Sequence, residues 1–290
     1  MRGRSQRRTT DAALLVALLG LGVLATLPVW REIVEVAWSD PEQSHILLAL
    51  PVAGWLAWVR RGRSRLCTWR RSLLGSAIIA AGGAMSILGR RTDIEIAWHA
   101  GAIMMLAGAP ITVYGPDLLR RFLPAFGALA ALMPVPGRIR QEIALPLQQV
   151  SAQAGEFVLD LFGVPITRSG NVLIINDVQV AVAEACNGMR MVAALALVTY
   201  AFVFAVPMRN SIRAVIVVCC PVIAVIANVL RLVPTTLFYG YADHETAELF
   251  HDISGWVVLA MAFGVLWLLL ALLRWLEFPI APYGVAEEGA

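Results

Sequence analysis

Long apolar runs recur along this chain, and they constrain its fold more than any other feature. A membrane-spanning helix needs roughly 17–25 predominantly apolar residues, because the hydrocarbon core of a bilayer is about 30 Å thick. Such runs occur from residue 12 to residue 274. Only 15% of the residues are charged and 59% are hydrophobic, whereas soluble domains are about 25% charged. The sequence therefore predicts an all-α polytopic membrane protein.

Eight candidate transmembrane helices account for these runs. Their approximate ranges are 12–30, 44–60, 72–89, 94–113, 119–133, 186–206, 212–233 and 253–274. The first run follows an arginine-rich start, as the apolar core of a signal peptide does. It lacks a small-x-small cleavage site before Trp30, so we interpret it as a retained span. The fifth run is short and contains Pro124, which disfavours a continuous helix.

Arginine placement orients these helices. Arginines gather before the first run, in every second connection and after the last run: Arg2, Arg4, Arg7, Arg8, Arg60, Arg61, Arg63, Arg65, Arg70, Arg71, Arg120, Arg121, Arg209, Arg213 and Arg274. Arginine-rich connections stay on the cytoplasmic side of a membrane, so we expect a cytoplasmic N-terminus. The connections at 134–185 and 234–252 are then extracytoplasmic. The predicted segments are helices one to five at 1–133, an outer segment at 134–185, helices six to eight at 186–274 and a cytoplasmic tail at 275–290.

The outer segment is predicted to be structured. Between residues 138 and 162, apolar residues recur at helical spacing: Ile139, Ile143, Leu147, Val150, Phe157, Val158 and Leu161. This pattern is typical of an amphipathic helix, and two placements fit it: on the outer leaflet of the bilayer or packed against the transmembrane bundle. Residues 164–182 are rich in β-branched residues. Turn sequences at 169–170 and 176–177 then predict a small β-hairpin or meander.

A cysteine follows this β segment at the predicted start of the sixth transmembrane helix. Cys186 lies in the run Glu-Ala-Cys-Asn-Gly-Met-Arg, residues 184–190. A thiol reacts as its thiolate, and a free cysteine with a pKa of about 8.5 is mostly protonated at neutral pH. The unpaired N–H groups of a helix N-terminus favour the anion. Arg231 and His251 are predicted to lie at ends of the seventh and eighth helices, on the same outer side.

These three residues form a candidate catalytic site. Cys186 would be the nucleophile, and His251 a general base or cationic partner that later protonates the leaving amine. Arg231 would hold the oxyanion. Six neighbours have candidate supporting roles: Asn187 as a further oxyanion donor, Gly188 for close approach of the substrate backbone, Arg190 with Glu184 or Asp252 as its partner, and Asn228 to orient a neighbouring group.

Each of these residues also has an interpretation without catalysis. A lone cysteine at a helix end is commonly structural, an arginine near the interface commonly snorkels to the headgroups, and His251 suits an interfacial position. Metal binding is another interpretation, because His244, Glu248 and His251 share one face of a possible helix and are zinc-ligand types. The spacing is not His-Glu-x-x-His, and the chain offers no obvious further ligand beyond His45 or His99. We therefore expect no metal.

Three motifs in order resemble the exosortase/archaeosortase family of integral-membrane cysteine transpeptidases. They are Glu-Ala-Cys-x-Gly-x-Arg at 184–190, Asn-x-x-Arg at 228–231 and His-x-x-x-Gly-Trp at 251–256. The similarity extends upstream to the proline-rich turn after the fifth run and covers about residues 120–270. Asn187 stands where a serine or threonine is expected most often, so no hydroxyl role is implied there.

The resemblance implies a sortase-like reaction on the outer face of a bacterial cytoplasmic (inner) membrane. Such enzymes process membrane-anchored proteins that carry a C-terminal sorting signal of the PEP-CTERM type. Cys186 would form a thioacyl enzyme that an acceptor amine, a glycan acceptor or water resolves, with Arg231 and His251 completing the catalytic trio. The expected partners are these substrates and the bilayer, with no cofactor and no nucleic acid.

Two alternatives stay open at this stage. One is a non-catalytic membrane component or a transporter for envelope polysaccharide, in which the polar trio is structural or binds lipid. Against transport, the sequence shows no buried acid pair and no symmetric pair of Gly/Pro-broken segments of the kind that carriers use. The other alternative is plain hydrolysis, because the nucleophile that reaches the thioester decides between hydrolysis and transfer.

Overall fold

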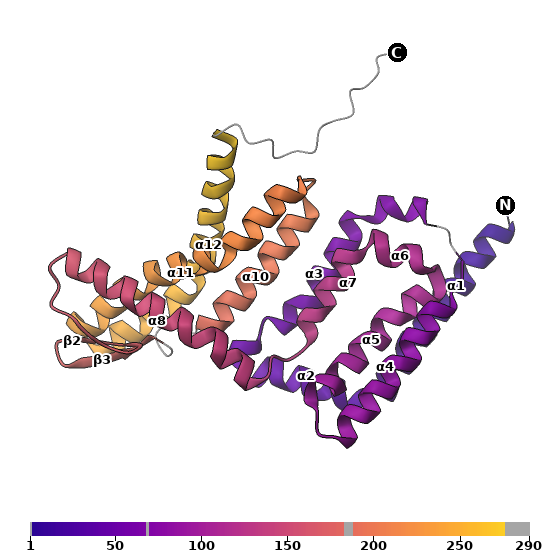
Figure 1. The fold of residues 1–290 in the computed structure, drawn as a ribbon, viewed down its shortest axis with the longest axis horizontal. Helices are drawn as coiled ribbons and strands as arrows, with labels where there is room; N and C mark the ends of the chain where they lie inside the picture. The colour runs from indigo at the N-terminus through magenta and orange to yellow at the C-terminus, as the bar shows by residue number, and fades with distance from the viewer. Residues whose placement is uncertain (1, 68–69, 183–187, 276–290) are drawn as a thin grey trace, which may run out of the picture. The chain divides into compact units, whose positions relative to one another are not determined.

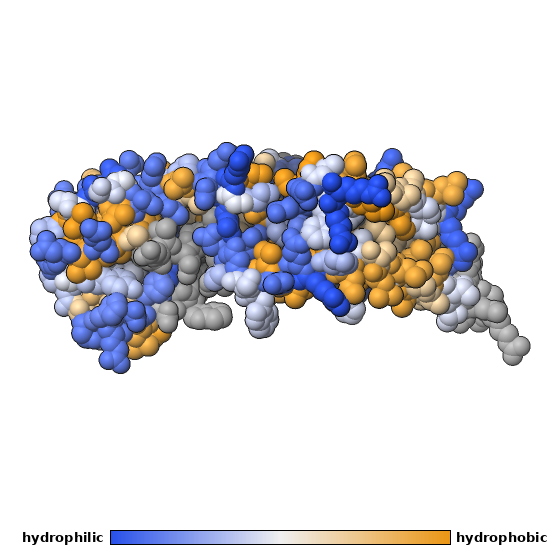
Figure 2. Space-filling model, turned by 90° about the horizontal axis from the view of Figure 1, so that it is seen from below, coloured by the Kyte–Doolittle hydropathy of each residue, from blue (hydrophilic) through white to orange (hydrophobic). Residues whose placement is uncertain are grey.

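A computed structural model of the chain describes residues 2–67, 70–182 and 188–275 (Figure 1). It is mostly helical and contains a small three-stranded sheet, as the sequence predicts. The chain divides into two compact units, Met1–Pro136 and Gly137–Ala290. Large apolar side chains are exposed on both units, and orange apolar surface lies between hydrophilic patches in Figure 2. Such exposure suits helices that contact lipid.

The first unit consists of helices. They are α1 (Arg2–Ala25), α2 (Leu27–Ser39), the 3-10 turn η1 (Pro41–Gln43), α3 (Ile46–Val59), the 3-10 turn η2 (Arg61–Leu66), α4 (Leu73–Arg91), α5 (Glu95–Tyr114), α6 (Pro116–Arg121), α7 (Leu123–Leu129) and the 3-10 turn η3 (Ala130–Leu132). The α4 and α5 helices form a hairpin whose contact surface is a row of glycines. At Gly82, a Cβ atom would lie 2.7 Å from the carbonyl oxygen of Gly101. The two backbones therefore touch, as small residues allow in membrane helices.

The second unit combines helices with the sheet. Its elements are α8 (Gly137–Leu161), β1 (Thr167–Ser169), β2 (Val172–Ile175), β3 (Val178–Ala181), α10 (Gly188–Ala205), α11 (Asn210–Tyr241) and α12 (His244–Trp275). The α11 and α12 helices form a second hairpin, joined only by residues 242–243. The stacked rings of Phe238 and Phe250, with centroids 4.2 Å apart, pin the two helices together near this turn.

Among the described residues, three helices are long and apolar enough to cross a bilayer: α4, α5 and α11. A fourth span results if α1, from Thr9, and α2 are taken together; they meet at an angle of 78°. Pro28 lies in the first turn of α2, where proline starts a helix easily but cannot continue one. The predicted first span, 12–30, is thus bent and extends to Ser39.

The predicted fifth span is also broken. The α6 helix ends at Arg121, α7 begins at Leu123, and Pro124 occupies the first turn of α7. This leaves a short apolar stretch, Leu123–Leu132, which is below the length that a bilayer requires. The structure therefore shows three to four candidate spans, and a complete set of eight stays a prediction.

The sheet confirms the predicted β segment as an antiparallel meander in the order β1-β2-β3. Asn176 and Asp177 connect β2 to β3 with φ angles of 47° and 63°, the left-handed backbone of a two-residue hairpin turn. Ile175 and other inward-facing side chains of the sheet pack with Leu232 of α11 and Ala152 of α8. Asn176 Nδ2 also donates a hydrogen bond of 2.9 Å to the carbonyl oxygen of Gly240. The sheet is thus fixed to α11.

The α8 helix confirms the predicted helix and shows which of its faces is packed. Small or polar residues form most of the buried face: Ala144, Gln148, Ser151, Ala152, Gly155 and Leu159. On the opposite face, five large apolar side chains are exposed: Ile139, Ile143, Val150, Phe157 and Leu161. At 100° per residue these five fall within one narrow stripe. The apolar face of the helix is therefore not its packed face.

Candidate active site

Part of the predicted site lies outside the described residues. These are Cys186, Glu184 and Asn187. The α10 helix begins at Gly188, two residues after Cys186 in the sequence, and includes Arg190 in its first turn. Asp252 lies in α12, beside His251 in the sequence. The geometry of the site is therefore built from α11 and α12.

Arg231 of α11 is buried and held by α12. The residue is only 5% exposed. Nε donates a hydrogen bond of 3.0 Å to Ser254 Oγ, and an Nη2 hydrogen donates one of 3.2 Å to the carbonyl oxygen of His251. A buried guanidinium needs such acceptors, because an isolated charge is expensive to remove from water. These bonds fix the plane of the guanidinium.

Ser254 joins Arg231 to the backbone of His251. Its hydroxyl accepts from Arg231 Nε and donates a hydrogen bond of 2.8 Å to the carbonyl oxygen of His251. One hydroxyl can do both, since it has one donor and two acceptor positions. The arginine, the serine and the histidine carbonyl thus form a closed set of three hydrogen bonds. This set brings together two of the three residues predicted to be catalytic.

The short turn explains why Arg231 and His251 meet. Arg231 lies ten residues before the end of α11, and His251 lies seven residues after the start of α12. Helices rise about 1.5 Å per residue, so in an antiparallel hairpin the two positions come to a similar level. Asp243 starts α12 by accepting hydrogen bonds from the backbone N–H and the hydroxyl of Thr246. These bonds hold the pKa of the Asp243 carboxyl below its usual value.

The predicted helix ends were wrong. We expected Arg231 and His251 at ends of transmembrane helices, within or beside an outer connection at 234–252. Both lie inside long helices, and the connection is reduced to residues 242–243. Hydropathy marks where polar residues enter a run, whereas a helix continues for as long as its backbone bonds are made. Here α11 continues through Pro234 for two further turns.

Asn228 extends the polar face of α11 beyond Arg231. Its side chain is buried, and among the described residues its Oδ1 atom has no hydrogen-bond partner. It lines a cavity of about 20 Å³ together with Gln148 and Ser151 of α8, roughly the volume that one water occupies. Gln148 Oε1 in turn accepts a hydrogen bond of 2.9 Å from Asn171 Nδ2, beside the sheet. A polar path therefore connects the sheet, α8 and the helix that carries Arg231.

The zinc hypothesis has no support in the described part of the chain, where no group of three or more histidine, cysteine, aspartate or glutamate side chains is placed to hold a metal. His244 Nε2 lies 3.2 Å from Glu248 Oε1, and both side chains are well exposed. They form an ordinary i, i+4 pair on the surface of α12.

Ser254 is the site residue that sequence reasoning missed. It stands inside the His-x-x-x-Gly-Trp motif, yet the motif alone suggests no role for it. The available signal was its spacing, because a residue three positions after His251 lies on the same helix face. A hydroxyl on that face, level with a buried arginine of the neighbouring helix, is a natural hydrogen-bond partner.

Comparison with known proteins places the chain in a family. The family described as transmembrane exosortase matches residues 37–268. The chain belongs to the exosortase family. The match includes the positions of Cys186, Arg231 and His251 and confirms the resemblance seen in the motifs. No curated protein and no solved structure matches the chain. This exosortase is accordingly a membrane protein, in agreement with its apolar helices.

Proposed function

We propose that this exosortase is a cysteine peptidase or transpeptidase that cleaves C-terminal sorting signals of exported proteins. The observation that carries the proposal is the buried hydrogen-bonded set of Arg231, Ser254 and the His251 carbonyl in a member of the exosortase family. Ionisable side chains inside membrane proteins are costly and mark functional sites. An arginine buried and aligned in this way is suited to binding developing negative charge.

The proposed reaction begins with the Cys186 thiolate. Its sulfur attacks the carbonyl carbon of the scissile peptide bond, and the carbonyl oxygen becomes an oxyanion that Arg231 stabilises. The C–N bond then breaks, and His251 supplies the proton that the leaving amine takes up. This leaves a thioester between Cys186 and the new carboxyl end of the substrate. An acceptor amine resolves the thioester to an amide, and water resolves it to an acid.

Arg231 fits the oxyanion role better than a lysine would. Guanidinium remains protonated at all physiological pH values and presents its donors in a planar fork. Because α12 fixes Nε and one Nη2 hydrogen, the orientation of the fork is set before the substrate arrives. Catalysis by preorganised donors requires this, since donors that must turn during the reaction lose much of their effect.

The other predicted residues complete the proposal. Asn187 and the backbone N–H groups after Cys186 add donors for the oxyanion, and Gly188 gives the substrate backbone room. Arg190 pairs with Glu184 or Asp252. Asn228, one turn before Arg231 on α11, orients the polar face of that helix.

We place the site on the outer face of a bacterial inner membrane, with a cytoplasmic N-terminus and eight crossings. The segments are those at 1–133, 134–185, 186–274 and 275–290. The exposed apolar stripe of α8 supports an interfacial position for this helix, because an amphipathic helix suits the interface of a leaflet. Its polar flank includes Glu156, which pairs with Arg168 of β1 at 2.7 Å. The helix would lie on the outer leaflet beside the sheet.

The proposal is tested by substituting Cys186 with alanine or serine. The full chain is reconstituted in lipid vesicles with a membrane-anchored substrate that bears a C-terminal sorting signal, and cleavage is followed on gels. We expect no cleavage by either variant. Cys219→Ala is the matched control, since Cys219 is a partly exposed cysteine on α11, and it should cleave at the wild-type rate. Unchanged cleavage by the Cys186→Ala variant would contradict the proposal.

A further inference from the structure

An apolar groove in the first unit is lined by residues of α3, the end of α5 and the α6–α7 segment. Its volume is about 410 Å³. Its lining includes the small residues Ala53 and Ala57 and the rings of Phe122 and Phe126. Only two lining side chains are polar, Arg61 and Tyr114. The lining of the groove is thus apolar except at these two residues.

Both polar groups lie at the same end of this groove. Ala53 and Ala57 lie one turn apart on α3, and Arg61 begins the 3-10 turn η2 that follows the helix. Tyr114 is the last residue of α5. The apolar lining therefore suits a hydrocarbon chain, and the two polar groups suit a polar end of the same ligand.

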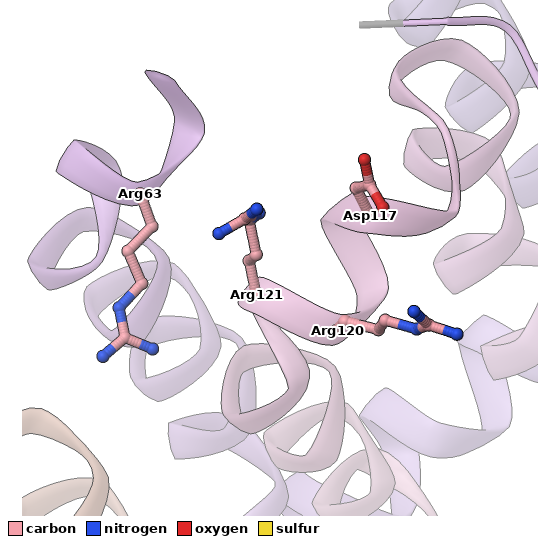
Figure 3. A pocket seen from close by; sticks show the side chains of 4 residues that line it. All are labelled: Arg63, Asp117, Arg120 and Arg121. Carbon is pink, nitrogen blue, oxygen red and sulfur yellow. The ribbon is translucent and has the colours of Figure 1, made fainter. Parts of the chain in front are cut away.

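A basic pocket adjoins the polar end. It has a volume of about 350 Å³ and is lined by Arg63, Asp117, Arg120 and Arg121. Figure 3 shows the Arg121 side chain directed into the space between the Arg63 segment and Asp117, whereas Arg120 points to the other side of α6. The α6 segment connects the two sites, since its Leu118 lines the groove. Arginines therefore surround the end at which the apolar groove becomes polar.

A tryptophan marks the depth of this end in the membrane. The guanidinium carbon of Arg61 lies 4.3 Å from the ring centre of Trp58, and Nη1 donates a hydrogen bond of 3.2 Å to the Trp58 carbonyl oxygen. Trp58 is 64% exposed. Exposed tryptophans of membrane proteins gather at headgroup level. The arginines thus lie where lipid phosphates lie, and their number predicts the cytoplasmic leaflet.

We infer that the first unit binds one anionic phospholipid, with an acyl chain in the apolar groove and its phosphate among the arginines around Arg121. Basic pockets between helices on the cytoplasmic side bind anionic headgroups. Inorganic phosphate would match the arginines but would leave the groove unused, and a zwitterionic lipid would match the groove but gain less from the arginines. The inference does not depend on the proposed reaction, because no residue of this site belongs to the candidate active site.

The test measures lipid retention and thermal unfolding of the full chain in neutral detergent. Phosphatidylglycerol is compared with phosphatidylcholine of the same acyl chains and with inorganic phosphate alone, using native mass spectrometry and the melting temperature. We expect retention of one phosphatidylglycerol and a higher melting temperature with that lipid only. Equal retention of phosphatidylcholine, or full stabilisation by phosphate alone, overturns the inference.

Two variants separate the parts of the site. Arg63→Gln with Arg121→Gln should weaken phosphatidylglycerol binding by about 20- to 30-fold, since each basic residue near anionic lipid contributes a factor of about five. Ala57→Phe should block the groove and prevent lipid retention while the arginines remain. The matched control is Arg90→Gln with Arg91→Gln, two exposed arginines at the end of α4, which should bind as wild type. Equal losses in the control and the pocket variant contradict the assignment.

Discussion

The α4–α5 and α11–α12 hairpins both pair long helices through a short turn, yet they pack by different means. In α4–α5, glycines bring backbone against backbone, and a Cβ at Gly82 would lie 2.7 Å from the Gly101 carbonyl oxygen. In α11–α12, a buried arginine crosses between the helices and bonds to Ser254 and the His251 carbonyl. Glycine packing suffices to hold two membrane helices together. A buried arginine is costly in a membrane helix and marks functional sites, so we infer a role for Arg231 beyond holding the two helices together.

The largest effect is expected at Arg231. Arg231→Lys keeps a positive charge but loses the planar fork, so cleavage of a sorting-signal substrate should fall by about 10²–10³-fold, as for removal of an oxyanion donor. Rates in reconstituted vesicles measure the change.

Arg213→Lys is the control for this substitution. Arg213 lies on the same helix, bonded to Asn210 at 3.1 Å, and its variant should cleave within about twofold of wild type. If Arg231→Lys behaved in the same way, the arginine would be only a structural contact between α11 and α12.

A substitution in the α4–α5 hairpin should change the stability of the protein. Gly82→Ala forces a methyl group against the α5 backbone and should destabilise the protein by about 1–3 kcal/mol, as overpacking does. Gly83→Ala is the matched change, because its Cβ would meet only Met105 Sδ at 3.7 Å. Thermal unfolding in detergent should separate the two variants. Equal melting temperatures would contradict the backbone contact between α4 and α5.

A smaller effect on rate is expected at Ser254. Ser254→Ala removes the acceptor of Arg231 Nε, a contact of about 1–2 kcal/mol, and should lower kcat roughly tenfold with KM unchanged. Ser254→Thr should restore the rate because it keeps the hydroxyl. Ser86→Ala tests a buried serine of the α4–α5 hairpin and should leave kcat unchanged. A rise in KM alone, or no rescue by threonine, would argue against a positioning role.

The smallest effect concerns the thiol of Cys67. Burial raises its pKa, Arg121 opposes this rise and Asp117 adds to it. The thiolate fraction at neutral pH is therefore low, and alkylation should be slow at pH 7.5 and accelerate at higher pH than for a free cysteine. Peptide mapping after iodoacetamide treatment measures the rate of Cys67 alkylation at each pH. Arg121→Gln should slow the labelling further, and faster labelling would contradict the assigned neighbours.

Much of this fold could be predicted from sequence, because the signals were local. Asn176-Asp177 between β-branched runs predicts a tight turn, and apolar spacing between residues 138 and 162 predicts α8. The packed face of α8 was not predictable, since Gln148 and Ser151 look solvent-exposed until Asn228 is placed beside them. Pro28 indicates the bend before α2, but a hydropathy value averaged over a window of residues does not register a single proline.

In the candidate site, too, some features could be predicted from the sequence and others depend on how the helices pack. Arginine counts and helix alternation predicted Arg231 and His251 on one side of the bundle, and the hairpin turn at residues 242–243 brings them together. The contact itself depends on which side chains face across two helices. Charge counts and alternation do not contain this information, so Ser254 could not be assigned a role from them.

The central claim, a thiol nucleophile served by Arg231 and His251, is tested most directly by the mass of a covalent intermediate. The protein is mixed with a sorting-signal substrate, quenched in acid, digested and mapped by mass spectrometry. The account predicts the acyl part of the substrate as a thioester on Cys186, released as a hydroxamate by hydroxylamine and absent from the Cys186→Ala variant. Cleavage that proceeds with the adduct on another residue, or undiminished in the Cys186→Ala variant, would contradict it.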